Sequence, residues 1–159
     1  MPKQVCLIFR SYDKKENIHE LLKIKNECKK FRIKFYLSNN IRLAIKLSLD
    51  GAYIPSFNKS FNHNAFKLKK GFKLIGSAHN IYEIKIKEKQ NISKIFLSPL
   101  FKTTKKKDNL GIYKFIKLAK QTKKNVVCLG GVRNYNIKKI NMMGFNSIAS
   151  ITMINNYDR

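Results

Sequence analysis

The stretch "VVCLGGVRNYN", residues 126–136, decides how the chain is interpreted. It is a short, β-branched apolar run that ends in two adjacent glycines, Gly130 and Gly131, in a chain with seven glycines. Such a run is typical of a buried strand followed by a loop. A helical pattern (135–144) and a second β-branched run (147–152) follow it, so the stretch opens a β–α–β unit.

The same alternation extends along the whole chain. Segments with helical spacing, such as Ile18, Leu21 and Leu22, lie between the strand-like runs. Strands separated by helices imply a parallel sheet, and nearly continuous apolar strands fit a sheet covered on both faces. An open doubly wound sheet and most of a (β/α)8 barrel both fit this α/β order. The predicted strands are 4–10, 33–38, 51–55, 73–78, 94–99, 125–131 and 147–152, and the predicted helices are 17–31, 39–49, 80–89, 110–121 and 135–144.

Length and composition predict one folded domain over residues 1–159. A chain of 159 residues with 43% hydrophobic residues is long enough to bury a core. No apolar run approaches the roughly 20 residues that span a bilayer, and the apolar stretch near the start is too short for a signal peptide. We therefore expect a soluble, cytoplasmic protein.

The net charge of +25 raises the question of an anionic partner. The lysines are spread over every polar segment, and only residues 102–107 (KTTKKK) form a dense cluster. Specific nucleic-acid binding requires cations gathered on one face, so we expect no specific nucleic-acid partner and no membrane partner. Non-specific adhesion to polyanions at low salt is the expected consequence of the charge.

The cysteines and histidines predict neither a disulfide framework nor a metal site. Cys6, Cys28 and Cys128 are far apart and odd in number. Cys6 and Cys128 lie in apolar runs, so we expect buried, reduced thiols there. His19 and His63 lie in polar segments, where solvated side chains are expected.

Polar and cationic residues follow the predicted strands, at the ends where active groups lie in both architectures. Arg10 ends the first strand, Ser77 and His79 lie at the end of the fourth, and the basic cluster follows the fifth. Carboxylates are almost absent from these positions. The rim therefore suits an anion.

The glycines after the sixth strand admit two interpretations. Gly130 and Gly131 can adopt positive φ and let N–H groups approach a ligand, and the loops after the last two strands of a barrel often bind phosphate. Thr152, after the seventh strand, would add N–H groups at the same point. A tight strand-to-helix turn explains the same glycines without a ligand. We predict a phosphate site between this turn and Thr152 and keep the tight turn as the alternative.

Four segments of the chain match one known family in the same order. They are SNNIRLAIKLSLDGAYIPS (38–56), KLIGSAHNIYE (73–83), IFLSPLFKTTKKKDNLG (95–111) and VVCLGGVRNYNIKKINMMGFNSIASITMI (126–154). Together they resemble the thiamine phosphate synthase/TenI family, over about residues 4–154. The resemblance implies a TIM-barrel-like fold for a single domain, 1–159. Synthases of this family join a hydroxymethylpyrimidine diphosphate to a thiazole phosphate with Mg²⁺, and TenI-like relatives isomerise the thiazole phosphate with a histidine.

The resemblance also assigns binding residues. Gly131, beside Gly130, matches the glycine whose backbone contacts the thiazole phosphate, and Ile151 and Thr152 match the pair after the last strand. Ser77 matches a serine near the diphosphate, and Arg10 matches an arginine after the second barrel strand. The threonine loop corresponds to Thr103, Lys105 and Lys106, the two lysines standing where a threonine and a lysine are found in the family.

Departures from the family pattern concentrate on the diphosphate and its metal. Tyr12 replaces a lysine, and Asn39 and Asn58 stand where the family has aspartates. Mg²⁺ prefers sites with one or two carboxylates. We therefore expect no resident cofactor, with Mg²⁺ only in company with a diphosphate ligand, and synthase activity that is absent or very weak.

The resulting hypothesis is a diverged family member that binds a phosphorylated thiazole or a similar phosphate ester. One alternative is a thiazole tautomerase that uses His79 for proton transfer, since imidazole titrates near neutrality. Another is a non-catalytic phosphate-binding protein. The register starts the chain at the second barrel strand, so we expect an incomplete barrel of about seven parallel strands. Its unpaired edge would be covered by a homodimer or a capping segment.

Overall fold

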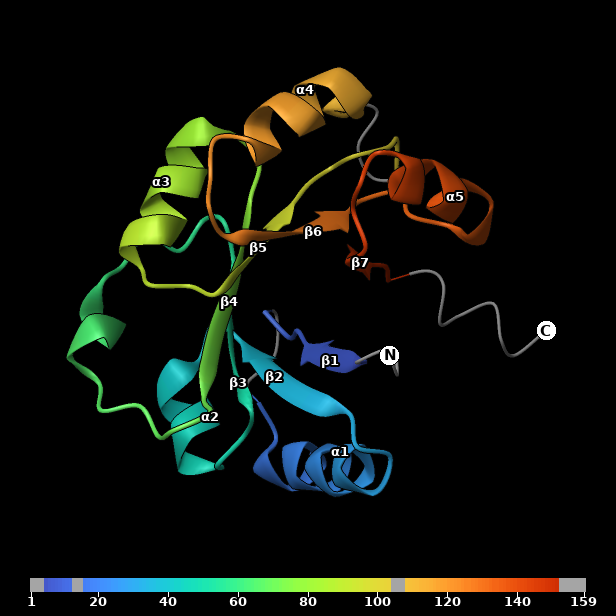
Figure 1. The fold of residues 1–159 in the computed structure, drawn as a ribbon. Helices are drawn as coiled ribbons and strands as arrows, with labels where there is room; N and C mark the ends of the chain where they lie inside the picture. Colours follow the sequence, from blue (N-terminus) through green and yellow to red (C-terminus); the bar gives the residue numbers. More distant parts are fainter. Residues whose placement is uncertain (1–4, 13–15, 104–107, 152–159) are drawn as a thin grey trace. The chain divides into compact units, whose positions relative to one another are not determined.

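The computed structural model describes residues 5–12, 16–103 and 108–151 (Figure 1). Within these ranges, seven strands alternate with five α-helices and one 3-10 helix. In chain order these elements are β1 (Cys6–Phe9), α1 (Ile18–Lys30), β2 (Lys34–Ser38), α2 (Ile41–Lys46), β3 (Gly51–Ile54), η1 (Asn62–Ala65), β4 (Lys73–Ala78), α3 (Ile81–Lys89), β5 (Lys94–Leu97), α4 (Gly111–Ala119), β6 (Asn125–Leu129), α5 (Asn134–Met142) and β7 (Ile148–Ala149).

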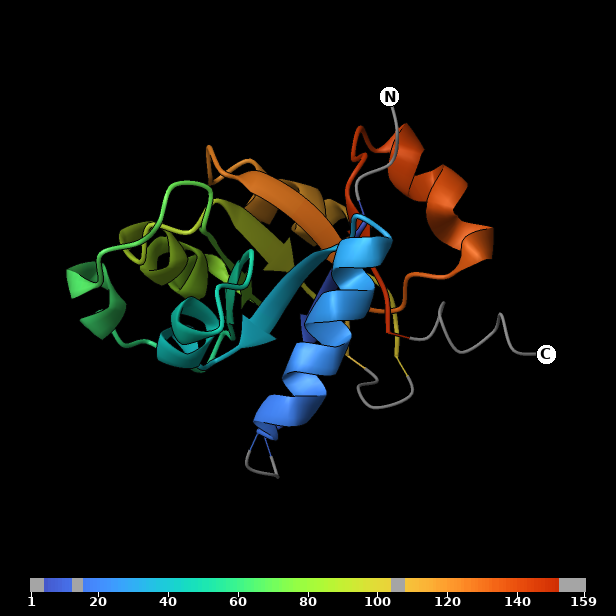
Figure 2. The same ribbon diagram turned by 90° about the horizontal axis from the view of Figure 1, so that it is seen from below.

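The strand order follows the chain from β1 to β7. Contacts divide the chain into two compact units, Met1–Ile75 and Gly76–Arg159. In the first unit, β1 pairs with β2 and β2 with β3, both in parallel, and α1 and α2 pack on these strands (Figures 1 and 2). In the second unit, β5 pairs with β6 and β6 with β7, also in parallel. The parallel α/β fold is the one predicted from the alternating pattern.

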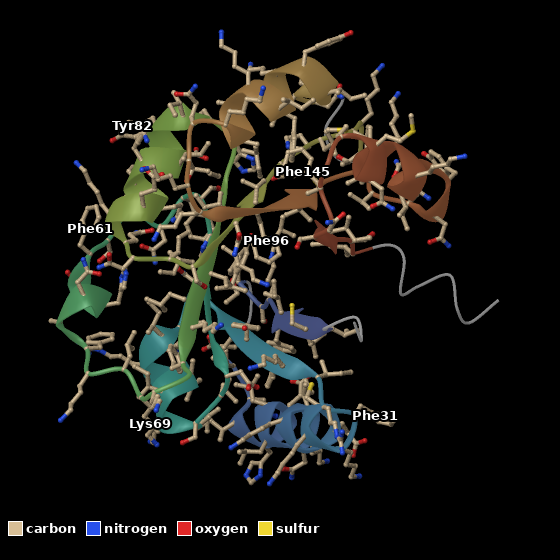
Figure 3. The ribbon with its side chains drawn as sticks, viewed as in Figure 1. Phe31, Phe61, Lys69, Tyr82, Phe96 and Phe145 are labelled. Atoms are coloured by element: carbon tan, nitrogen blue, oxygen red, sulfur yellow. The ribbon has the colours of Figure 1, made fainter. Side chains whose placement is uncertain are left out.

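Each unit buries its own apolar residues. In the first unit, Leu21 of α1 and Phe35 of β2 are almost fully buried. In the second, Ile95 of β5 and Phe115 of α4 have no exposed surface. Phe145, labelled in Figure 3, packs edge-to-face on Phe115 with ring centroids 5.3 Å apart. The apolar core of each unit therefore fixes the strands, and with them the loops at the carboxyl ends of the strands.

Four helices end in the same backbone motif. A residue in the left-handed conformation follows the helix, and the N–H of the next, apolar residue donates to the carbonyl five positions earlier, as in a Schellman motif. Glycine is the residue that usually adopts this conformation without strain. Among these four described helix ends, only one has glycine at the left-handed position. The left-handed residues are Arg32 (φ 55°), Ser48 (φ 49°), Asn91 (φ 57°) and Gly144 (φ 83°), and the apolar residues after them are Ile33, Leu49, Ile92 and Phe145.

Two predictions about burial are wrong. Cys6, expected to be buried, is exposed, because it opens β1, which among the described strands pairs with β2 alone. His63, expected to be solvated, is buried in η1, an element that the sequence pattern did not predict. Cys28 and Cys128 are buried, and burial raises the pKa of the Cys128 thiol to about 12. None of the helices in the described part of the chain has the length and apolar character to span a membrane.

Candidate functional site

The backbone at His79 is fixed by the first turn of α3. His79 follows the last residue of β4, and Asn80 caps α3 by accepting the N–H of Glu83 at 2.9 Å. The Glu83 carboxylate in turn accepts the N–H of His79 at 2.7 Å. These two hydrogen bonds therefore tie the end of β4 and the backbone of His79 to the first turn of α3.

The imidazole of His79 is oriented by Ser98 at the end of β5. Its Nδ1 lies 2.7 Å from the Ser98 carbonyl oxygen and 3.1 Å from the Ser98 hydroxyl oxygen. A carbonyl can only accept, so in the neutral imidazole Nδ1 carries the hydrogen and Nε2 keeps its lone pair. The side chain is half-buried. Nε2 is thus the atom that can take a proton from a bound molecule or return one to it.

The segment after Ser98 lies directly on the glycine turn that follows β6. The N–H of Phe101 donates to the Gly130 carbonyl at 3.0 Å. A Cβ on Gly130 would lie 2.6 Å from the Cα of Pro99, and one on Gly131 would lie 2.5 Å from the carbonyl oxygen of Lys102. Both glycines have positive φ (93° and 66°). Close packing therefore accounts for both glycines without a ligand, in line with the tight-turn alternative.

The same turn still presents a donor. Asn136, in the first turn of α5, donates from Nδ2 to the Gly131 carbonyl at 2.8 Å and accepts the N–H of Arg133 at 3.0 Å. No hydrogen bond to a described residue uses the N–H of Gly131. Ser150, beside the exposed Ile151, donates to the Val132 carbonyl at 2.9 Å, which brings the end of β7 to this turn.

The structure brings only some of the predicted site residues together. His79, Gly130 and Gly131 all contact residues 98–102, and Thr103 continues that segment. Ser77 is a buried residue of β4. Three further predicted residues, Lys105, Lys106 and Thr152, lie outside the described residues.

Arg10 belongs to the first unit, where it joins an aromatic cluster. Its guanidinium lies 5.0 Å from the ring centroid of Tyr12. The Tyr12 ring packs edge-to-face on Phe57 at 5.4 Å, and its hydroxyl is 2.8 Å from the Ser38 hydroxyl. Tyr12 therefore contacts the Arg10 guanidinium, the Phe57 ring and the Ser38 hydroxyl.

The described residues at the end of β2 and after β3 do not fit a dedicated Mg²⁺ site. Asn58 donates from Nδ2 to the side-chain oxygen of Asn39 at 2.7 Å, and its own side-chain oxygen accepts the N–H of Ser60 at 2.9 Å. The nearby Glu16 carboxylate accepts from Asn40. Among the described residues, no three carboxylates, histidines or cysteines are grouped to hold a metal. Neutral amides lack the carboxylate charge through which Mg²⁺ is usually bound.

Three positioning residues escaped the sequence analysis. Glu83 stands three residues after Asn80, a helix-start spacing that could have indicated its role. Asn136 likewise lies in the first turn of its helix. Ser98 orients His79 through its main-chain carbonyl as well as its hydroxyl, and a carbonyl contact leaves no signal in residue type.

A family model described as thiamine monophosphate synthase matches residues 3–154. The chain is 26% identical over 151 residues to the thiamine-phosphate synthase of Prochlorococcus marinus strain AS9601, covering 93% of this chain and 43% of that protein. It is 29% identical over 152 residues to that of Methanosarcina barkeri strain Fusaro, covering 92% and 68%. The chain thus spans less than half the length of the first of these relatives.

The fold is also found in a solved structure, a thiamine phosphate pyrophosphorylase from Pyrococcus furiosus. The match has a TM-score of 0.72 at 17% identity and covers 94% of this chain and 72% of that one. It confirms the TIM-barrel-like α/β fold class. Together with the family match over nearly the whole chain, it leads to one conclusion: the chain belongs to the thiamine monophosphate synthase family of thiamine biosynthesis.

Proposed function

We propose that the chain binds a small phosphate ester, of which a phosphorylated thiazole is the candidate that its family favours, at the carboxyl ends of β4 to β7. The observation that carries this proposal is the contact of both His79 and the Gly130–Gly131 turn with one segment, residues 98–102. The turn offers the N–H of Gly131, and the histidine offers Nε2. A phosphate and a ring that exchanges a proton would use these two groups together.

The chemistry proposed for this site needs no metal. A thiazole next to His79 would lose a proton to Nε2 and regain one at another ring position, while the phosphate stays on the turn. Joining the thiazole to a pyrimidine diphosphate is a different task, because the departing diphosphate needs a cation with bridging geometry. The amides of Asn39 and Asn58 offer no carboxylate for such a cation. This supports our proposal that synthase activity is absent or very weak.

The isomerase is thus the second candidate, and the Nδ1–Ser98 contact favours it because it fixes which nitrogen is the base. A protein that binds the ester without turnover would bind the phosphate at the glycine turn, but His79 would not convert the ligand. Conversion of one thiazole phosphate isomer to the other, followed by NMR, separates the two. His79→Gln should abolish conversion and leave binding nearly intact.

A thermal-shift panel tests the binding itself. Thiazole phosphate, thiamine phosphate, pyrophosphate and inorganic phosphate are compared with and without Mg²⁺. Saturating thiazole phosphate should raise the stability by about 2.7 kcal/mol at a hundredfold excess over its dissociation constant, with no dependence on Mg²⁺. Asn136→Ala should weaken the effect because it releases the Gly131 turn, whereas the exposed control Lys138→Gln should not. Equal or absent shifts for all four compounds would contradict the proposal.

The synthase reaction provides the opposite test. Both synthase substrates and Mg²⁺ are supplied, and thiamine phosphate is measured. Turnover near the ordinary enzyme scale of about 1 per second or above would refute the metal-independent assignment.

A further inference from the structure

The first unit contains a cavity of about 430 Å³. It lies where β2 begins, at Lys34, and where the chain enters β3, at Asp50. The last turns of α1 and the residues after α1 and α2 form its other walls, and the end of α1 is marked by Phe31 in Figure 3. Its volume is within the range of small-molecule sites.

Cations dominate the lining of this cavity. Lys25, Lys29, Arg32 and Lys34 contribute to its walls, and Asp50 is the single carboxylate among the described lining residues. The Asp50 carboxylate accepts the N–H of Phe35 at 2.9 Å. The carboxyl ends of α1 and α2 each add a partial negative charge of roughly one half. An excess of about two positive charges therefore remains in the cavity.

Most of these cations have no partner among the residues that the structure describes. Lys25 donates to the Leu47 carbonyl at 2.8 Å. The side chains of Lys29, Arg32 and Lys34 make no hydrogen bond or ion pair with any described residue. Lys29 and Arg32 are exposed and Lys34 is half-buried, so solvent ions screen their mutual repulsion until an anionic ligand takes the place of those ions. Arg32 is moreover held at φ 55° by the helix end, which fixes the backbone from which its side chain reaches the cavity.

The floor of the cavity is apolar. Cys28, Phe35 and Leu49 contribute to it, and each is at least nine-tenths buried. The Ser48 hydroxyl at the rim accepts from Lys69 at 3.2 Å. A cation cluster over an apolar floor suits a ligand that carries both a phosphate and a hydrocarbon or ring portion.

We propose that this cavity is a second anion site, which binds the phosphate or diphosphate group of a small organic molecule through Lys29, Arg32 and Lys34. Arginine presents a planar fork of donors to phosphate oxygens, and the two lysines add point charges. The site is separate from the carboxyl-end site at His79 and does not depend on the proposed function.

The test is a titration of the full chain with inorganic pyrophosphate at physiological ionic strength, followed by backbone amide shifts. Saturable shifts are expected at residues 32–35 and 48–50, while Gly131 reports the other site separately. The double variant Lys29→Gln/Arg32→Gln should weaken this binding about tenfold or more, because it removes two charge-assisted contacts. The control Lys23→Gln/Lys46→Gln changes two exposed cations of the same helices and should leave the affinity within about twofold.

Either of two results would overturn the proposal. Shifts at residues 32–35 and 48–50 that stay linear up to millimolar pyrophosphate would show that no site exists there. Equal weakening by the two double variants would show that the chain's net charge, and not the cavity, attracts the anion.

Discussion

Lys87 is fully buried in α3, and its titration should control how stability varies with pH. Its Nζ donates to the side-chain oxygen of Gln90, which is also buried, at 2.8 Å. Burial lowers the pKa of Lys87 from 10.5 to about 8, although the nearby Glu83 acts in the opposite direction. We consider the replacement Lys87→Met, which keeps an unbranched side chain and removes the charge.

The size of the effect follows from that pKa. Between pH 8 and 10.5 the unfolded chain keeps the proton on Lys87 and the folded chain has lost it. The free energy of unfolding therefore rises with pH across this window, by about 1.4 kcal/mol per pH unit. The total is about 3 kcal/mol, and this destabilisation is fully present below pH 8.

Cys128 opposes this trend. Its pKa is raised from 9.0 to about 12, so above pH 9.0 the unfolded chain loses a proton that the folded chain keeps, and stability falls. The informative quantity is therefore the wild-type value minus the Lys87→Met value, in which the Cys128 contribution cancels. Loss of the Gln90 partner adds a penalty of about 1–3 kcal/mol to the variant, which does not vary with pH.

Urea unfolding at several pH values between 8 and 10.5 measures this difference directly. The difference should grow by about 1.4 kcal/mol per pH unit in favour of the wild type. Lys89→Met, which replaces an exposed lysine of the same helix, should show a flat difference. Parallel pH profiles for the wild type and Lys87→Met would refute the reasoning.

Four further variants have defined outcomes. Ser48→Gly and Asn91→Gly should each raise the free energy of unfolding by about 0.5–1 kcal/mol in urea denaturation, since both residues occupy the left-handed conformation that glycine tolerates. Gly131→Ala should lower it by about 1–3 kcal/mol, because its Cβ would lie 2.5 Å from the Lys102 carbonyl oxygen; an unchanged midpoint would contradict the packing account. Asn39→Asp/Asn58→Asp should create Mg²⁺-dependent thermal stabilisation that the wild type lacks, and a Mg²⁺ shift of equal size in the wild type would disprove the amide-pair interpretation.

The strands and helices could be predicted because their signal is local. Every predicted strand and α-helix is present; most are shorter than predicted, β4 has the predicted bounds, and α5 begins one residue earlier. Buried residues such as Leu21 and Ile95 follow the apolar spacing of the element that they occupy. Burial at single positions depends on neighbours elsewhere in the chain. The burial predictions for Cys6 and His63 were wrong for that reason. The sequence pattern around these residues does not reveal that β1 has one partner or that His63 lies in a 3-10 helix.

The candidate site could be predicted in part. The glycine pair and His79 were identified because glycine and histidine are informative residue types at strand ends. The contacts that define their geometry were not, because they join distant residues: Ser98 is 19 positions from His79, and Asn58 is 19 positions from Asn39. The burial of Lys87 could not be predicted either, since a lysine inside a helical pattern is ordinarily exposed.

The hydrogen bond between Glu83 and the N–H of His79 links the proposed base to the fraying of a helix end. Glu83 sits in the first turn of α3, and helix termini open locally at a much lower free energy than the whole domain. Each such opening breaks the hydrogen bond that holds the backbone of His79. If the Asn80 cap were weakened by about 1.4 kcal/mol, the opened fraction would increase tenfold. Amide hydrogen exchange at His79 and Glu83 would follow that opening. The fraction of molecules in which the imidazole is correctly placed therefore depends on the local stability of the helix end as much as on the residues around the ring.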